Sequence, residues 1–490
     1  GGHNCKEGEA ALLLDAQVVD LDLNALFSDA PSPIGAPVSG TVKLNGKGRT
    51  VPQLLAGLTG DIQLHASTPP AGASRSGRRE VSMTARRTTA GMRAVVHSFK
   101  WGDTDITGSV EYHDSSPPLL VVEITGGSVS LQEFEGTDTK SKTEADKKSE
   151  DSILGKTAMA SVDFVGDVIR APFKFLSGTR EATPGEKLFS TKPLPFAWLA
   201  KQQATLKGRL DKLSSHEGEA TDLTFSVELL DGQLSAQTNA GTVNHGTGSL
   251  QLTLDLGAQP ATAALTGTFK DMRGDLVKAN TPRSGYFDLA SHGHTQAELA
   301  ANLSGLVYLE LGPGTLDYTR LMLVTADVAT SIFRTLIPGA DTKPPQLECA
   351  VTLGVFKDGR GVTPYGYAAR TDLANLVGKM EIDLKKELIH MNFSSSSRQG
   401  IGISVGNVFS NTVEVEGPLS DPEVVPNTTG LLWRGWAAMI TGGLSVVGES
   451  MLKRVLASEN PCKTVRKHIH KEFGPSNPAA AASEMICPPA

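Results

Sequence analysis

Apolar and polar residues alternate along much of this chain, which is the pattern of a strand with one apolar face. The segment 249–256, SLQLTLDL, shows it most clearly, because every second residue is a leucine and most of the residues between are polar. Successive side chains of a strand point to opposite faces of a sheet, so the leucines share one face. They are Leu250, Leu252, Leu254 and Leu256. The pattern predicts a one-sided antiparallel sheet.

Similar strand patterns run from Ala11 to Phe134 and resume at Ala204, with Gly, Pro and Asp-Ser turns between them. The first of these regions is predicted to be a β-meander. Between the two, Thr137–Asp151 combines mixed charge with no large apolar residue, which predicts a loop or linker.

Three stretches instead space their apolar residues by three and four positions, which predicts amphipathic helices. They are Ile153–Leu176, Arg320–Leu336 and Leu431–Leu456. Prolines mark where they stop, and the third is expected to end before Asn460-Pro461.

One stretch occurs twice. Ser284–Gly312 aligns without a gap on Ser39–Ser67, matching Gly and Leu positions throughout. Each copy reads as a strand, one or two helical turns and a second strand. We therefore expect two homologous strand–helix–strand units that extend one sheet.

Composition and charge favour some types of fold and argue against some classes of partner. With 51 Gly, 27 Pro and 5% aromatic residues in 490, the chain suits many short strands and turns better than several compact cores. The formal net charge of −7 argues against a nucleic-acid partner, which needs a basic surface. The longest uncharged apolar stretch, Gly435–Gly448, is well short of the ~20 residues of a spanning helix. Because the sequence opens at Gly1, we expect a preceding segment that carries any membrane anchor.

One catalytic pattern is present, a GxSxG at Gly402–Gly406, followed in hydrolase order by Asp421 and by His468 or His470. A nucleophile elbow needs a helix after the serine, whereas the residues that follow read as a strand. We therefore expect no catalytic residue and no enzyme activity.

The other histidines also lack a strong chemical reading. His292 and His294 correspond to Lys47 and Arg49 in the first repeat copy, so they are expected to be exposed turn residues, with no metal and no cofactor. His468 and His470 lie in the basic run Lys463–Lys471, for which a solvated face and attraction to anionic headgroups both stay open.

Several longer stretches resemble the AsmA family of bacterial envelope proteins, especially its C-terminal domain. They occur in family order at Leu188–Leu213, Leu223–Leu256, Ser284–Tyr318, Leu347–Val362 and from VGKMEIDLKKELIHMNF to VEGPLSDPEVVP. The stretch from WGDTDITGSVEY to LLVVEITGGSVSLQEF resembles the family's upstream repeat. The resemblance implies a long, twisted sheet that forms an apolar-lined groove, in design like bridge-type lipid-transfer proteins.

That resemblance implies a periplasmic protein of outer-membrane maintenance that binds phospholipid acyl chains and conducts them passively. The alternative is an assembly factor in outer-membrane protein biogenesis that binds envelope proteins. From the strand pattern alone, a closed sandwich and an open groove are equally compatible. The groove-facing candidates are Leu206, Leu250, Leu252, Leu254, Leu256, Val307, Leu309 and Leu311.

The third predicted helix has two readings. Its apolar stripe suits core packing, but its tryptophans also suit docking on a bilayer or plugging the end of the groove. The stripe consists of Trp433, Trp436, Ile440, Leu444 and Val447.

The expected organisation has four parts: an N-terminal β-repeat region at 1–135, a linker with a helix at 136–185, the AsmA-like groove region at 186–425, and a C-terminal helix and tail at 426–490. A periplasmic location with an inner-membrane anchor outside this sequence is implied. In that oxidising compartment Cys462 and Cys487 are expected to pair, while Cys349 is expected to be a buried free thiol.

Overall fold

The protein is mainly β, as predicted, and its strands join in one 22-stranded sheet. The computed structural model describes residues 10–21, 38–49, 57, 59–67, 79–88, 90–131, 187–194, 196–215, 218–273, 281–315, 345–398, 411–426 and 454–473. The chain divides into two compact units. Unit 1 comprises Gly1–Thr179, Ala200–Gly232 and Thr238–Gly241; unit 2 comprises Arg180–Leu199, Gln233–Gln237 and Thr242–Ala490.

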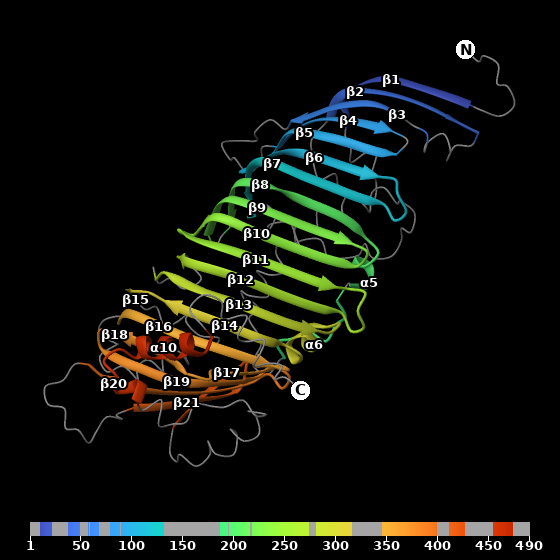
Figure 1. Ribbon diagram of the computed structural model, residues 1–490. Coiled ribbons are helices and arrows are strands. Elements are labelled where there is room, and N and C mark those ends of the chain that lie inside the picture. The colour runs from blue at the N-terminus through green and yellow to red at the C-terminus, as the bar shows by residue number, and fades with distance from the viewer. Residues whose placement is uncertain are drawn as a thin grey trace. The chain divides into compact units, whose positions relative to one another are not determined.

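Unit 1 begins with the predicted meander, in which β1 to β7 pair antiparallel in sequence order (Figure 1). The strands are β1 (Ala10–Leu21), β2 (Val38–Gly48), β3 (Thr59–Ser67), β4 (Arg79–Thr88), β5 (Gly91–Trp101), β6 (Thr104–His113) and β7 (Leu119–Ser130). Two more strands follow, β8 (Gln203–Ser215) and β9 (Gly218–Leu230). The pairing of β7 with β8 is parallel, which the strand patterns did not predict.

Adjacent rows of side chains across unit 1 differ sharply in polarity. The register places nine apolar residues in one row from β1 to β9: Ala16, Val42, Ile62, Ala85, Ala94, Val110, Val122, Leu206 and Val227. The next row, on the other face, contains Lys43, Asp61, Arg86, Arg93 and Glu111. The apolar row thus crosses all nine strands, whereas the polar row runs from β2 to β6 and gives way to Val121 on β7.

Unit 2 continues with antiparallel strands and short helices (Figure 1). The strands are β11 (Gly246–Asp255), β12 (Thr262–Met272), β13 (Arg283–His292), β14 (Ser304–Leu311), β15 (Gly314–Thr315), β16 (Gln346–Lys357), β17 (Arg360–Val362), β18 (Tyr367–Thr371), β19 (Ala374–Asp383), β20 (Leu388–Ser397), β21 (Asn411–Pro418) and β22 (Glu423–Pro426). The helices are α5 (Phe196–Leu199), α6 (Gln296–Ala301) and α10 (Pro461–Phe473). Strand β10 (Gln233–Val243) is divided between the units.

The second repeat copy has the expected order of strand, short helix and strand, in β13, α6 and β14. Thr295 is the N-cap of α6: its Oγ1 accepts from the Glu298 amide, and Glu298 Oε2 in turn accepts from the amide of His294, the residue before the cap. In β13 and β14 Leu289 lies opposite Gly305, just as Leu44 lies opposite Gly60 in β2 and β3. The two copies therefore share one strand register, although the helix expected in the first copy lies outside the described residues.

Several predictions fall where the structure gives no description. The linker Thr137–Asp151 and the helices Ile153–Leu176 and Arg320–Leu336 lie outside the described residues. Of Leu431–Leu456, only the last three residues are described, and they are helical. The four-part organisation stays a prediction.

Candidate functional site

The predicted groove-facing residues of unit 2 lie on one face of the sheet. One row across this face runs from β11 to β21 through Leu252, Leu265, Leu289, Gly305, Phe356, Gly361, Ile382, Ile389 and Gly417. The neighbouring row on the same face joins Leu250 through Gly267 and Phe287 to Val307. The register thus brings together two groups of candidates that are far apart in sequence. We call this surface the apolar face.

Burial on the apolar face changes along unit 2. On β11 to β13, Leu252, Leu265 and Leu289 are half-buried, and none of the hydrophobic clusters of the described residues includes them. On β19 to β21 the same face contributes buried residues to a cluster that includes Leu376, Phe393 and Val415. The candidate Leu311 is a buried member of that cluster, and Leu309 packs against it. The part of the apolar face that remains available is therefore near β11 to β13.

The remaining candidates are also placed. Leu254 is half-buried on β11, while Leu256, just after that strand, is buried. Leu206 belongs to the apolar row of unit 1 and is buried. All three side chains are therefore partly or fully shielded from solvent. The described residues do not establish a groove around them.

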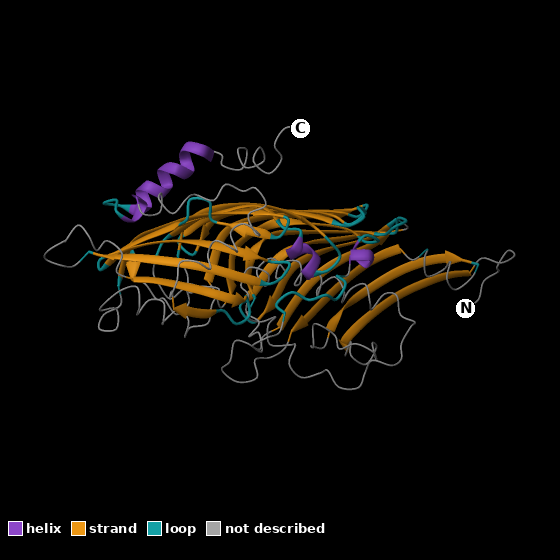
Figure 2. Cartoon of the chain, turned by 90° about the horizontal axis from the view of Figure 1, so that it is seen from below, coloured by secondary structure: helices purple, strands orange, loops and turns teal. Residues whose placement is uncertain are grey.

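The face opposite the apolar face is polar on β11 to β13 and becomes apolar at β14. The row of Gln251, Thr266 and Asp288 is polar, but its continuation on β14 and β16 is Leu306 and Val355, both buried. Helix α10 packs at this place, on β16, β18 and β19 (Figure 2). The helix contributes Cys462, Val465 and Ile469, at helical spacing, to the cluster that contains Leu306.

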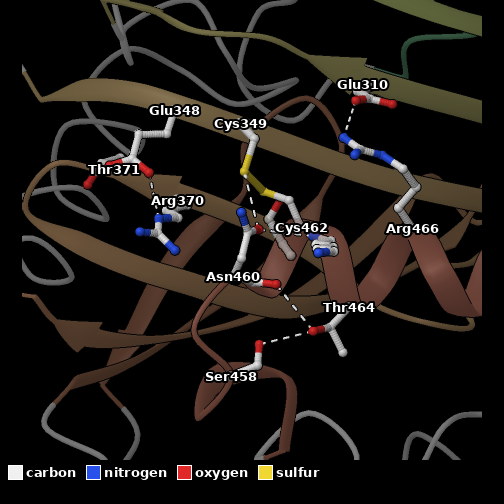
Figure 3. The surroundings of a disulfide bond; sticks show 12 residues. Glu310, Glu348, Cys349, Arg370, Thr371, Ser458, Asn460, Cys462, Thr464 and Arg466 are labelled. Atoms are coloured by element: carbon white, nitrogen blue, oxygen red, sulfur yellow. Dashed lines mark hydrogen bonds and ion pairs between the residues drawn. A yellow bond between two sulfur atoms is a disulfide. The ribbon is translucent and has the colours of Figure 1, made fainter.

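The cysteine prediction was wrong. Cys349 on β16 and Cys462 on α10 form a disulfide, with Cα atoms 6.4 Å apart (Figure 3). Cys349 is therefore not a free thiol, and Cys462 does not pair with Cys487. The sequence pointed to the nearer cysteine in the chain, whereas the packing of α10 places Cys462 beside β16.

Helix α10 was itself missed, because Lys463–Lys471 was read only as a basic run. The signals were present: Asn460 is the N-cap, its Oδ1 accepting from the Lys463 amide at 3.0 Å, and Pro461 occupies the first helical position. The preceding residues Val455 and Leu456, at the end of the predicted third helix, are buried in the α10 cluster. That end of the predicted helix is core.

Polar side chains also fix α10 to the sheet. Arg466 Nη2 forms an ion pair with Glu310 Oε1 (Figure 3). Glu310 Oε2 accepts a hydrogen bond from the Tyr308 hydroxyl at 2.8 Å. The Tyr308 ring stacks on Tyr286, with centroids 5.1 Å apart. Burial, and the neighbouring Glu310 carboxylate, raise the pKa of Tyr308 far above its ordinary value, so its hydroxyl stays a donor.

His468, on the same helix, does not belong to a solvated face. It is half-buried, its Nδ1 lies 2.7 Å from the Thr464 carbonyl, and its ring stacks on Tyr365. His470 is exposed. The predicted turn residues His292 and His294 are exposed, as expected.

A hollow of about 1010 Å³ lies in unit 1, and its lining comes from β2 to β6. The lining is largely polar and charged: Thr41, Lys43, Asp61, Gln63, Thr84, Arg86, Arg93, Glu111 and His113. Opposite charges meet there, with Arg86 Nε 2.8 Å from Asp61 Oδ1 and Arg93 Nε 3.2 Å from Glu111 Oε1. This hollow is not the apolar-lined groove that the sequence predicts, and its paired charges give it little net attraction for an ion.

One buried carboxylate stands out. Glu381 is 3% exposed, and neither carboxylate oxygen has a hydrogen-bond partner among the described residues. It lies opposite His390 on β20, beside Lys379 on its own strand. Burial raises the pKa of Glu381, although His390 and Lys379 oppose the rise.

The other site predictions lie outside the described residues. These are the stripe of Trp433, Trp436, Ile440, Leu444 and Val447, and the GxSxG at 402–406. Among the helices that the structure describes, none is long and apolar enough to cross a membrane. The described residues form no cluster of three or more His, Cys, Asp or Glu side chains suited to a metal ion.

Comparison with known proteins gives no relative. No model of a protein family matches the chain. No curated protein and no solved structure matches it either.

Proposed function

We propose that the protein binds phospholipid acyl chains on its apolar face and conducts them passively between membranes of a bacterial envelope, in the manner of an AsmA-type protein. The ligand is held by hydrophobic contact with the sheet, and no catalytic group, metal or cofactor takes part. The sequence resemblance suggested this role, and the strand register supports it independently.

The supporting observation is the row of Leu252, Leu265 and Leu289. These side chains lie side by side on successive strands and are only half-buried, while Gln251 and Thr253 on the other face of β11 are exposed. Apolar area left in water costs roughly 25 cal/mol per Å². An acyl chain lying across the strands would remove much of this cost, which is why an apolar ligand suits the face.

A periplasmic location is part of the proposal. The disulfide between Cys349 and Cys462 supports it, because such bonds persist in oxidising compartments and are rare in the cytosol.

Organic extraction of the purified protein followed by mass spectrometry tests the proposal. We expect phospholipid in the extract of the native protein and far less in that of a Leu252→Asp, Leu265→Asp double variant. A Thr253→Asp, Thr266→Asp variant, with the same charge on the opposite face, should retain the lipid. A folded native protein with no lipid above the level of a blank preparation would refute the proposal.

A second candidate function, binding of another protein in outer-membrane assembly, is favoured by β1. This strand pairs with β2, and it carries four of the large apolar side chains that are exposed: Leu12, Leu13, Leu14 and Val19, with Leu13 82% exposed. Among the described strands, β1 has a pairing register with β2 alone, and a long apolar strand with one partner is a template for strand addition.

Photo-crosslinking separates the two candidates. A crosslinker at Leu13 should capture an envelope protein if β1 accepts a partner strand, whereas a crosslinker at Leu252 should capture lipid if the apolar face carries acyl chains. Capture of protein at Leu13 with no lipid at Leu252 would favour the assembly role.

A further inference from the structure

We propose that the outward side of α10 is a docking surface for an anionic phospholipid bilayer. The surface consists of Lys463, Lys467, His470 and Lys471, and we call it the basic stripe. All four side chains are exposed, and the structure gives them no ion pair or hydrogen bond among the described residues. The proposal goes beyond lipid binding on the apolar face, since the basic stripe lies on a different element.

The geometry of α10 sorts its residues into two sides. Cys462, Val465 and Ile469 point into the cluster beneath the helix, and Arg466 on its flank is paired with Glu310. Lys463, Lys467 and Lys471 repeat every fourth residue, which places them on one outward line about 12 Å long at the helical rise per residue. Figure 2 shows α10 lying outside the strands of unit 2. The three lysines are exposed, whereas Cys462, Val465 and Ile469 are buried, so the line of lysines is on the solvent side of the helix.

Helix stability does not explain the stripe. Cations favour the last turn of a helix, which accounts for His470 and Lys471, but they oppose the dipole in the first turn. Lys463 is in the first turn, which contains no acidic residue. Like charges four residues apart also destabilise a helix. The lysines of the basic stripe therefore lower the stability of the helix, and an opposite charge on a partner would offset this loss.

The charge and the shape of the basic stripe indicate which partner it fits. The whole chain has a net charge of −7, so a concentration of unpaired cations on α10 is a local departure from it. A line of exposed lysines along the outer side of a helix can contact a flat anionic surface with all its charges at once. Such a line does not enclose a small anion. The disulfide from Cys462 to Cys349 ties the helix covalently to β16, so attachment through the stripe would hold the sheet as well.

Liposome flotation tests the docking surface. The native protein should float with vesicles of phosphatidylcholine mixed with phosphatidylglycerol, less at high salt, and not with phosphatidylcholine alone. Each lysine near an anionic leaflet raises binding roughly fivefold, so Lys463→Gln, Lys467→Gln, Lys471→Gln should lower the partition coefficient roughly a hundredfold. Thermal unfolding of this variant should match that of the native protein.

The control replaces three exposed lysines elsewhere, Lys207→Gln, Lys270→Gln and Lys385→Gln, which gives the same net charge. We expect it to float like the native protein. Equal flotation of the two variants, or flotation independent of phosphatidylglycerol, would overturn the proposal. Failure of the native protein to float would also overturn it, and retention on immobilised polyglutamate would then point to an acidic protein. Lipid extraction from the triple variant should be unchanged, so the result is separate from that for the apolar face.

Discussion

Cys349 on β16 and Cys462 on α10 are covalently joined, although 113 positions separate them in the sequence. The bond closes a long loop of the unfolded chain, so its loss should lower stability by about 2–5 kcal/mol. We expect Cys349→Ser and Cys462→Ser each to unfold at lower temperature than the native protein. Non-reducing peptide mapping should recover the two cysteines in one linked peptide. Cys487→Ser is the control and should unfold like the native protein; the pairing predicted from sequence would instead make it damaging.

Leu252→Asp and Thr253→Asp test the one-sided sheet at adjacent positions. Leu252 is half-buried opposite Leu265, whereas Thr253 is exposed. A charge at Leu252 should lower the free energy of unfolding by about 2–4 kcal/mol, and a charge at Thr253 by less than about 0.5 kcal/mol. Chemical denaturation measures both, and equal losses would contradict the assignment of the two faces.

Gly305 should not tolerate a side chain. Its φ of +132° disfavours other residues, and an added Cβ would lie 2.1 Å from the Asp288 carbonyl oxygen. Gly305→Ala should therefore cost at least about 2 kcal/mol. Gly257→Ala is the matched control, because its nearest neighbour would be Asp255 Oδ1 at 3.4 Å. Comparable denaturation midpoints for the two variants would contradict the close approach of β13 and β14.

Glu381 should make stability depend on pH. Burial raises its pKa in the folded protein, so the folded state binds a proton more tightly than the unfolded state does. Its contribution is therefore most favourable below the unfolded pKa and is lost as pH rises through the folded pKa. Glu381→Gln should raise the melting temperature at pH 7, with a gain that shrinks in acid. Glu416→Gln, at the exposed residue on the other side of His390, should change little.

The strands could be predicted because their signal is local. Alternation around Leu252 determines which side chains share a face, and turn residues divide the meander into strands. The second repeat copy could be read in the same way, down to the short helix that begins after Thr295.

Long-range relationships could not be obtained from such patterns. The choice of Cys349 as the partner of Cys462 depends on where α10 packs, and α10 packs where the polar face becomes apolar at Leu306. That change is visible only when the strands are placed in register. The pairing of β7 with β8 was missed for a similar reason, since no turn joins them.

The parallel pair β7–β8 has a consequence for the order of folding. Strands β1 to β7 can form as successive hairpins, each closing a loop that is short compared with the chain. Joining Leu119 to Gln203 requires closure over the whole segment between them, before any hydrogen bond compensates for the lost chain entropy. We therefore expect this pairing to be the slow kinetic step in assembling unit 1, and a destabilising change on β8 to leave the hairpins β1 to β7 able to form.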